Sequence, residues 1–303
     1  MARVVVFTEY GEPEVLHVIE VDDPIPGTDE MRIRVKAAGV QPYDAAVRRG
    51  AFANFRPATF PAQLGNEAAG IVDMVHHGVD GFVVGDEVLA FLDGTGYADT
   101  TLVPTANAVH KPPSMPWPEA GVISASGQTA KSALDELAIS DGDRLLIHAA
   151  AGGVGTFAVQ LAIARGASVI GTASERNHEY LAGIGAVPVT YGPGLTERVQ
   201  ALAPDGITAA LDCVGGEANE VSVALLGSPE RAVTLVDYDA EQRLGVRRVG
   251  TKRSAASLGV LTALYDAGGL KVEVAREFSL EEANLAHREI ESRHVRGKIA
   301  LVP

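Results

Sequence analysis

The first part of the chain alternates short apolar segments with breaks that contain glycine or proline. Valine, isoleucine and phenylalanine are frequent in these segments, as is typical of β-strands. Several short strands at this spacing favour a barrel or a sandwich over a parallel sheet. The pattern predicts strands at Arg3–Thr8, Leu16–Val21, Met31–Ala38, Ala69–Met74 and Phe82–Phe91.

A different pattern begins after the prolines of residues 112–118. Helix-like and strand-like segments then alternate, which is typical of βαβ units and of a doubly wound parallel sheet. The expected helices are Ala120–Leu137, Gly155–Gly166 and Asn177–Gly183. The expected strands are Arg144–Ala149, Ser168–Thr172, Val187–Thr190, Thr208–Cys213 and Ala232–Val236, with a further helix before the last of them.

The pattern ends with a helix expected at Leu280–Arg293 and a strand expected at Lys298–Val302. We expect this strand to return to the first domain. A length of 303 residues fits two domains, because one domain takes about 150 residues. The predicted fold class is therefore α/β. A β-rich domain of residues 1–118, completed by residues 270–303, accompanies a parallel-sheet domain of residues 119–269.

Composition and charge narrow the class of protein further. Hydrophobic residues make up 47% of the chain, which is enough to form a substantial core. The net charge of −14 disfavours nucleic acid and anionic membrane as partners. No apolar stretch approaches the roughly 20 residues that span a bilayer, and the first apolar run is too short for a signal peptide. We therefore expect a soluble cytoplasmic protein that acts on a small molecule.

The segment between the first strand and the first helix of the parallel-sheet domain carries the clearest chemical signal. Ala150, Gly152 and Gly155 fall on a G/A-x-G-x-x-G frame, and Gly153 and Val154 complete the turn where the helix begins. Glycine allows close approach of a diphosphate, and the helix N-terminus offers unpaired N–H groups to it. The turn therefore predicts a bound dinucleotide. A turn that serves packing alone is the alternative.

The end of the next strand indicates which dinucleotide binds. NAD usually requires an acidic residue at this position, and the residue here is Ala173. Ser174 and Arg176 follow, and a hydroxyl and a guanidinium suit a 2′-phosphate. Glu175 would favour NAD, but we expect its side chain to face solvent. NADPH is therefore the predicted cofactor, with Arg176 as an ordinary solvated charge the alternative.

At this point the chain resembles the medium-chain dehydrogenase/reductase superfamily, in its zinc-free quinone oxidoreductase (zeta-crystallin-like) branch. The resemblance covers nearly the whole chain, and its motifs occur in the same order. They are Gly39–Asp44 with Arg48, Leu64–Val72, Gly94–Asp99, Ser126–Ala130, Ala149–Gly155, Asp212–Gly216 and Val295–Ala300.

The resemblance implies a GroES-like β-barrel catalytic domain built from both chain ends and a central Rossmann domain. It also implies a cleft between them for cofactor and substrate, and a homodimer. By the same resemblance, Thr129 faces the nicotinamide, Val214 and Gly215 contact the cofactor ribose, and the backbone at Val236–Asp237 receives the carboxamide.

Zinc is not expected in this chain. Zinc-dependent members of the superfamily place a cysteine and a histidine where this sequence has Gln41 and Asn66. Amides are poor zinc ligands compared with thiolate and imidazole. The four-cysteine lobe is also absent, since Cys213 is the only cysteine. The histidines at positions 76, 77, 148, 287 and 294 have no partners at a recognisable metal-site spacing.

The predicted activity is reduction of a quinone or an α,β-unsaturated carbonyl by NADPH, because alcohol oxidation without a Lewis acid is difficult. Tyr43 is the candidate to hydrogen-bond the substrate oxygen, with Gln41 and Asn66 as further catalytic polar groups. Tyr43 as a wall residue is the alternative. We expect the loop Phe52–Phe60 to shape the pocket. An enoyl reductase acting on carrier-bound thioesters and a non-catalytic, crystallin-like NADPH-binding protein are the alternative functions.

Two other features have simpler interpretations. Cys213 is expected to be a buried thiol and not a nucleophile, because no base neighbours it. A basic run is expected to form a solvated face, with a second contact to the NADPH phosphates or to an anionic substrate as the alternative. Its members are Arg243, Arg247, Arg248, Lys252 and Arg253.

Overall fold

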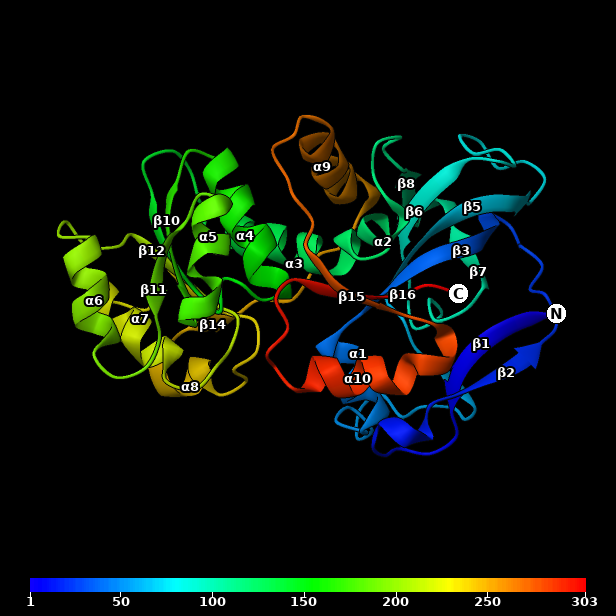
Figure 1. The fold of residues 1–303 in the computed structure, drawn as a ribbon, viewed down its shortest axis with the longest axis horizontal. Helices are drawn as coiled ribbons and strands as arrows, with labels where there is room; N and C mark the ends of the chain where they lie inside the picture. Colours follow the sequence, from blue (N-terminus) through cyan, green and yellow to red (C-terminus); the bar gives the residue numbers. More distant parts are fainter. The chain divides into compact units, whose positions relative to one another are not determined.

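The computed structural model describes residues 1–303 and divides the chain into two compact units. Figure 1 shows both units as a ribbon coloured along the sequence. Unit 1 contains Met1–Ala125, Arg253–Asp266 and Val272–Pro303, and unit 2 contains Ser126–Lys252 and Ala267–Lys271. None of the helices combines the length and the apolar character that crossing a membrane requires.

Unit 2 is built around a six-stranded, fully parallel sheet with the order β11-β10-β9-β12-β13-β14. Counted from β9, this is the strand order 3-2-1-4-5-6 of the dinucleotide-binding Rossmann fold. Leu145, Leu146 and Ile147 of β9 are completely buried, as expected for a parallel strand covered on both faces. The strands are β9 (Arg144–His148), β10 (Ser168–Ala173), β11 (Val187–Thr190), β12 (Ala209–Asp212), β13 (Ala232–Thr234) and β14 (Arg247–Arg248).

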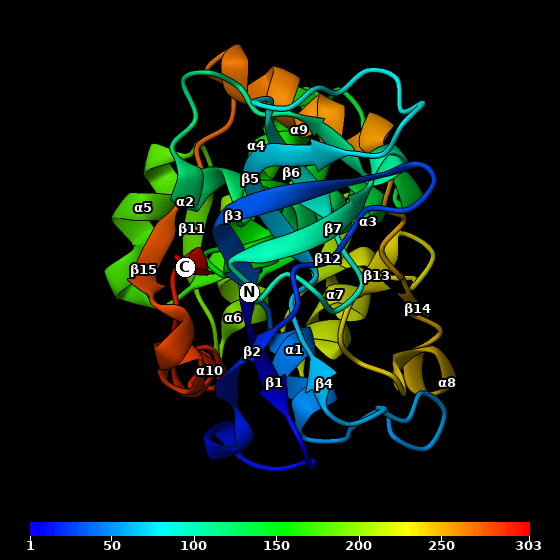
Figure 2. The same cartoon turned by 90° about the vertical axis from the view of Figure 1, so that its right-hand side faces the viewer.

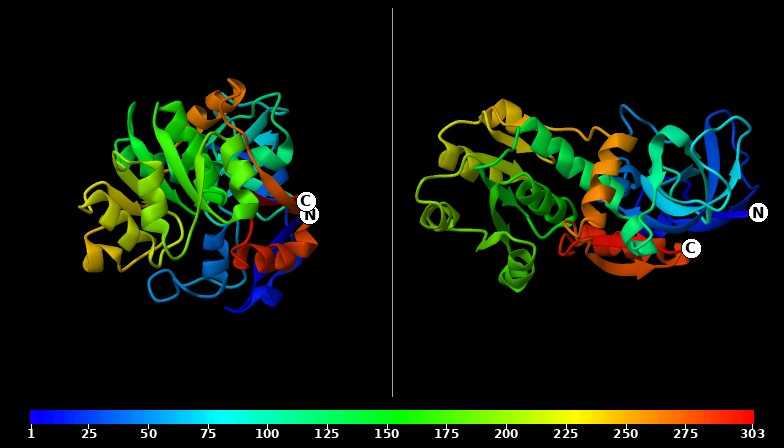
Figure 3. Two further views of the ribbon diagram at one scale, coloured as in Figure 1. Left: turned by 60° about the vertical axis from the view of Figure 1, so that its left-hand side comes forward. Right: turned by 90° about the horizontal axis from the view of Figure 1, so that it is seen from above.

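Helices cover both faces of this sheet (Figures 1 and 3). Ile170 of β10 packs in a cluster with Leu195 and Val199 of α6, whereas the next residue, Gly171, lies against Leu181 of α5. Successive residues of a strand point to opposite faces, so α5 and α6 lie on opposite sides. The helices are α3 (Ile123–Glu136), α4 (Gly153–Ala164), α5 (His178–Gly183), α6 (Leu195–Leu202), α7 (Ala218–Leu226) and α8 (Ala240–Leu244), with a 3₁₀ turn η3 (Glu175–Asn177).

Unit 1 is a β-structure in which strands from both ends of the sequence pair. Its larger sheet has the order β15-β16-β3-β5-β6-β8, with β7 paired to β3, and its smaller sheet has the order β2-β1-β4 (Figure 2). The strands are β1 (Ala2–Phe7), β2 (His17–Val21), β3 (Glu30–Val40), β4 (Ala62–Gln63), β5 (Glu67–Val75), β6 (Glu87–Phe91), β7 (Thr100–Pro104), β8 (Ala108–His110), β15 (Val274–Phe278) and β16 (Lys298–Leu301).

Short helices fill the space around these strands, and the core joins residues from early and late segments. Phe7, Ile33 and Tyr97 are completely buried in the same cluster as Ala286 and Leu301. The helices are α1 (Pro42–Arg48), α2 (Trp117–Ala120), α9 (Ala255–Asp266) and α10 (Ala283–Glu291), with 3₁₀ turns η1 (Pro13–Val15), η2 (Thr105–Asn107) and η4 (Leu280–Glu282).

The predicted α/β class is confirmed, and β16 does return to the first domain, where Ile299 pairs with Val40 of β3. The unit boundaries differ from the expected ones, because Arg253–Asp266 belongs to unit 1, where α9 packs against β8. The strand predicted to start at Phe82 starts at Glu87. Residues 83–86 form a turn in which the Asp86 carboxylate accepts a hydrogen bond from the Val83 N–H at 2.8 Å.

The packing of unit 2 predicts that Gly155→Ala destabilises the protein. A Cβ at position 155 would lie 2.6 Å from the Ala150 Cα, and closer still to the Ala149 carbonyl oxygen. We expect the free energy of unfolding in urea to fall by about 1–3 kcal/mol. Gly183→Ala is the matched control, because a Cβ there meets nothing within 4 Å. Equal effects of the two substitutions would contradict this account.

Candidate active site

The glycine turn lies at the carboxyl end of β9, the first strand of the Rossmann order. Ala149 adopts a left-handed conformation with φ of 54°, and its N–H donates to the Thr172 Oγ1 at 3.0 Å. The next N–H, of Ala150, donates to the Thr172 carbonyl at 2.9 Å. β10 therefore fixes the entry into the turn through a single residue, Thr172.

The same turn presents backbone N–H groups that suit a diphosphate at the start of α4. Gly152 is the N-cap residue of α4. Its carbonyl accepts the first hydrogen bond of the helix, which the Thr156 N–H donates. The N–H groups of Gly153, Val154 and Gly155 therefore have no acceptor within the helix. These groups, the helix dipole and the absence of a Cβ at Gly152 suit a bound diphosphate. The residues of this turn fit a dinucleotide.

The segment after β10 carries the groups expected to distinguish NADPH from NADH. Ala173 is buried at the strand end, and Ser174 begins the η3 turn, whose Asn177 N–H donates to the Ser174 carbonyl at 2.9 Å. The side chains of both Glu175 and Arg176 are exposed. Arg176 thus lies at the sheet edge where the ribose of a bound dinucleotide is expected.

A second set of residues expected to contact the cofactor is held by Asp212, at the carboxyl end of β12. One oxygen of this buried carboxylate accepts from the N–H groups of Val214 and Gly215 at 2.8 Å each. Its other oxygen accepts from the Thr234 hydroxyl at 2.7 Å and from Asn219 at 3.0 Å. Asp212 therefore sets the backbone of the loop that follows β12.

Thr234 extends this network to the loop after β13. Its Oγ1 accepts from the N–H groups of Val236 and Asp237 at 3.2 and 3.0 Å. The side chains of Val214 and Val236 are 51% and 44% exposed, which leaves apolar surface at this sheet edge. In the sequence, Asp212 appeared only as the first residue of a family motif, and Thr234 carried no predicted role. Polar residues at the ends of buried strands were the available signal.

Other unit 2 residues singled out from the sequence have partners within the unit. The Thr129 hydroxyl lies 2.7 Å from the Thr251 hydroxyl. Burial and the Asp212 carboxylate raise the pKa of the Cys213 thiol, which keeps it protonated. Burial lowers the pKa of His148 to about 4, and its Nε2 lies 2.9 Å from the Ser222 hydroxyl.

Most of the basic run is occupied by contacts within the protein. Arg243 forms ion pairs with Glu220 and Asp237, and Arg247 forms one with Glu136. Arg248 lies over the Tyr238 ring at 4.5 Å, and Arg253 donates to the Leu92 carbonyl at 2.7 Å. These contacts favour a structural role for Arg243 and Arg247.

In unit 1, Asp44 anchors the start of α1 and binds Asn66. Pro42 opens the helix, and the Gln41 N–H donates to the Asp44 carboxylate at 3.0 Å in a capping box. The same carboxylate accepts from Asn66 Nδ2 at 2.6 Å and from the Tyr97 hydroxyl at 2.9 Å. Burial raises the pKa of Asp44 to about 6, and these hydrogen bonds act in the opposite direction.

Gln41 joins a buried ion pair. Its Oε1 accepts from the Lys298 ammonium at 2.7 Å, and its Nε2 donates to the Glu67 carboxylate. The Lys298 Nζ lies 3.7 Å from the Glu67 Oε1, and both side chains are almost completely buried. Burial raises the pKa of Glu67 and lowers that of Lys298, while each charge opposes the other's shift. The Ala125 N–H also donates to Glu67, at 2.7 Å.

These partners do not fit a zinc ion at Gln41 and Asn66. Two carboxamides stand in place of the thiolate and imidazole ligands that zinc prefers, and the Lys298 ammonium beside Gln41 would repel a cation. No group of three histidine, cysteine or acidic side chains in the structure is arranged to hold a metal.

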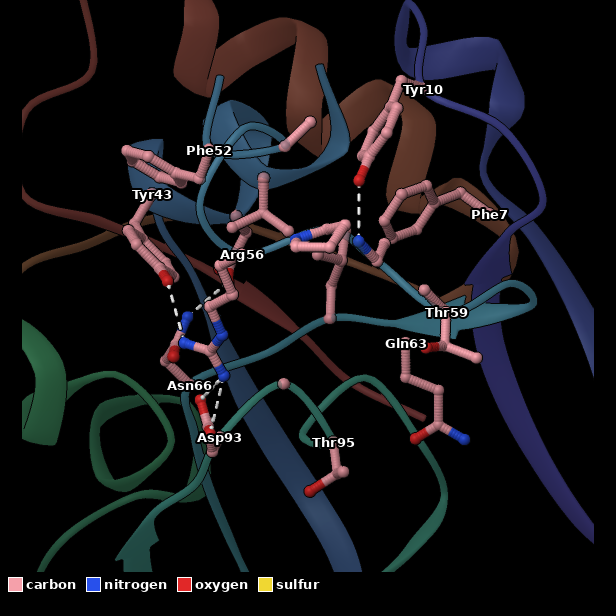
Figure 4. A pocket seen from close by; sticks show the side chains of 18 of the residues that line it. Phe7, Tyr10, Tyr43, Phe52, Arg56, Thr59, Gln63, Asn66, Asp93 and Thr95 are labelled. Atoms are coloured by element: carbon pink, nitrogen blue, oxygen red, sulfur yellow. Dashed lines mark hydrogen bonds and ion pairs between the residues drawn. The ribbon is translucent and has the colours of Figure 1, made fainter. Parts of the chain in front are cut away.

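A cavity of about 480 Å³ in unit 1 brings Tyr43 and Asn66 together (Figure 4). This volume lies in the usual range for small-molecule pockets. Residues of the loop predicted to shape the pocket, from Phe52 to Thr59, form much of its wall. Tyr43 is 40% exposed and stacks on Phe52 with ring centroids 5.2 Å apart. Gln41 does not line this cavity.

The cavity also contains residues that the sequence analysis did not single out. Arg56 Nη1 donates to the Tyr43 hydroxyl at 3.3 Å, and Arg56 Nη2 lies 2.8 Å from both oxygens of Asp93 (Figure 4). Asp44 lines the cavity as well. Arg56 lies in the loop Phe52–Phe60 that was expected to shape the pocket, but no motif in that loop singled out this residue.

Comparisons with known proteins agree with this geometry. Residues 27–113 match the family model described as an alcohol dehydrogenase GroES-like domain, and residues 184–301 match the one described as a zinc-binding dehydrogenase. A quinone oxidoreductase of Pseudomonas aeruginosa is 30% identical, and the alignment covers 100% of both chains.

Two further similarities concern a solved structure and a larger protein. The structure of Escherichia coli quinone oxidoreductase complexed with NADPH has a TM-score of 0.88 at 27% identity, covering 99% of this chain and 100% of that chain. A spectinabilin polyketide synthase system protein of Streptomyces orinoci is 31% identical over 90% of this chain, which corresponds to 13% of its own length.

The buried ion pair predicts a large effect of Lys298→Met on stability. Removing the ammonium leaves the Glu67 carboxylate buried without a counter-charge, so the free energy of unfolding in urea should fall by about 3–5 kcal/mol. The double variant Lys298→Met/Glu67→Gln should recover part of this loss, because the unpaired charge is gone. A single variant as stable as the wild type would contradict the assignment.

Proposed function

We propose a function from one premise: the chain belongs to the medium-chain dehydrogenase/reductase superfamily, in its quinone oxidoreductase branch. The protein is an oxidoreductase that uses a nicotinamide cofactor. In our proposal the cofactor is NADPH and no zinc takes part. The substrate is a quinone or an α,β-unsaturated carbonyl compound.

The observation that carries the proposal is the glycine turn between β9 and α4. Its three N–H groups without helical acceptors would hold the diphosphate, with Gly152 allowing close approach and Gly155 allowing α4 to pack against the turn after β9. Ser174 and Arg176 would bind the 2′-phosphate. Val214, Gly215 and Val236 would contact the rest of the cofactor, with Thr129 near the nicotinamide. NADPH, when bound, supplies a hydride.

The cavity of unit 1 supports the proposed substrate class. Tyr43 and Phe52 give it an aromatic wall, which suits a flat conjugated ring or enone. The Tyr43 hydroxyl can donate to a substrate carbonyl. The amide of Asn66 is held by Asp44, and Gln41 keeps the start of α1 in place through Lys298 and Glu67.

A second candidate function is an enoyl reductase acting on carrier-bound thioesters. The similarity to a polyketide synthase protein over 90% of this chain favours it. It would use a cationic rim for the phosphopantetheine arm, and Arg243 and Arg247 already have carboxylate partners. A non-catalytic NADPH-binding role is the third possibility, and turnover distinguishes it from the other two.

NADPH oxidation across a substrate panel tests the proposed activity. We expect turnover with ortho-quinones, para-quinones or alkenals, faster with NADPH than with NADH, followed by the fall in absorbance at the nicotinamide band. Treatment with EDTA should leave the rate unchanged, because no step uses a metal. Turnover confined to carrier-bound enoyl thioesters would favour the second function. No turnover with any substrate would favour the binding-protein role.

Arg176→Ala tests the assignment of the cofactor. Loss of a charge-assisted contact to the 2′-phosphate should raise the Kd for NADPH about tenfold, while the Kd for NADH stays the same. Isothermal titration calorimetry measures both. Glu175→Gln is the matched neighbour, and it should bind NADPH at least as tightly as the wild type, since a repelling charge is removed. Unchanged NADPH affinity in Arg176→Ala would contradict the assignment.

A further inference from the structure

The cavity of unit 1 contains one cation in a position to act on a ligand. Of the residues that line it, only Asp44, Arg56 and Asp93 belong to the acidic and basic residue types, and Arg56 is the only cation. Its guanidinium lies beside the phenolic oxygen of Tyr43, as Figure 4 shows. The two side chains come from α1 and from the loop that follows it, so they form one local unit of the cavity wall.

Arg56 has donors left for a ligand. A guanidinium carries five N–H groups. Nη2 contacts the two oxygens of Asp93, and one Nη1–H is directed to Tyr43. The Nε–H and the second Nη1–H have no acceptor in the protein. Because the Tyr43 oxygen accepts from Arg56, the phenolic hydrogen of Tyr43 is also available to donate.

The ion pair with Asp93 does not remove the charge of Arg56 from the cavity. The side chains of Arg56 and Asp93 are 58% and 66% exposed, so water screens their attraction. The other acid, Asp44, is buried and its oxygens accept from Asn66, Tyr97 and the Gln41 N–H. A negative charge on a ligand would therefore find in Arg56 the one cation of the cavity lining, with the Tyr43 hydroxyl beside it as a second donor.

We propose that Arg56 and Tyr43 form a paired donor site for the negative charge that reduction places on the substrate oxygen. This inference rests on the proposed function. In an enone, the hydride adds to the β-carbon and the π electrons move onto the carbonyl oxygen, which gives an enolate. In a quinone, the hydride adds to one carbonyl oxygen and the π electrons move through the ring onto the other, which gives a quinol monoanion. Arg56 and Tyr43 stabilise that oxyanion through two hydrogen bonds, and a proton from water then completes the product.

The site binds phenolates without the cofactor, which gives a test independent of turnover. The probe is 4-nitrophenolate, a flat aromatic oxyanion, titrated into the cofactor-free protein at a pH where the phenol is ionised. Arg56→Gln should weaken its binding about tenfold, and Tyr43→Phe should weaken it by a smaller factor. Binding of 4-nitroanisole, which has the same ring and no charge, should change little in either variant.

Two further variants sharpen the test. Asp93→Asn should bind 4-nitrophenolate about twofold more tightly than the wild type, because the competing carboxylate is removed. Arg34→Gln is the matched control, since Arg34 is an exposed arginine of β3 that pairs with Asp73 of β5 and does not line the cavity. It should bind both probes as the wild type does.

Several outcomes would overturn the proposal. They are phenolate binding unchanged in Arg56→Gln, an equal loss of 4-nitroanisole binding in that variant, or a loss in Asp93→Asn equal to that in Arg56→Gln.

Failure of the proposed function is recognised separately. If the wild type binds phenolate through Arg56 and still consumes no NADPH with any quinone or enone, the anion site stands and the proposed reductase function is wrong. In an active enzyme, Arg56→Gln should lower kcat about tenfold with a smaller change in KM.

Discussion

A buried ion pair holds the candidate catalytic unit together. Lys298 of β16 and Glu67 of β5 lie 3.7 Å apart with almost no exposure to water. Two buried charges are tolerated only when each is paired and hydrogen-bonded, and here Gln41 and the Ala125 N–H supply the additional bonds. The first residue of β5, the start of α1 and the first residue of β16 are thereby fixed relative to one another, and the cavity wall continues from α1.

Both units use a buried carboxylate to fix the backbone around a candidate binding site. In unit 2, the buried carboxylate of Asp212 accepts from backbone N–H groups of the loop after β12 and from the Thr234 hydroxyl. Thr234 in turn accepts from the N–H groups of the loop after β13. In unit 1, the buried carboxylate of Asp44 orders the start of α1 and holds Asn66. In both units, a buried carboxylate holds in place the residues that would contact a ligand.

The features of the fold that depend on local sequence pattern could be predicted from the sequence. The glycine turn, the parallel strands around it and the return of β16 to the first domain follow from periodicity, glycine spacing and family resemblance. The start of β6 was missed because Val83 and Val84 read as strand residues, whereas Asp86 closes a turn there. The partners of Gln41 were not predictable, because Lys298 is 257 residues away along the chain. Arg56 was missed for a different reason: hydrogen-bond geometry in a loop leaves no trace in residue spacing.

The pairing of β16 with β3 has a consequence for the order of synthesis on the ribosome. Ser126–Lys252, the bulk of unit 2, is one continuous stretch, so its sheet can form while the chain is still being translated. Unit 1 must wait, because the ammonium that neutralises Glu67 emerges with one of the last strands to be made. During that interval β3 lacks its neighbour β16, and Glu67 lacks the counter-charge that its burial requires. This period is when we expect the chain to depend most on chaperones.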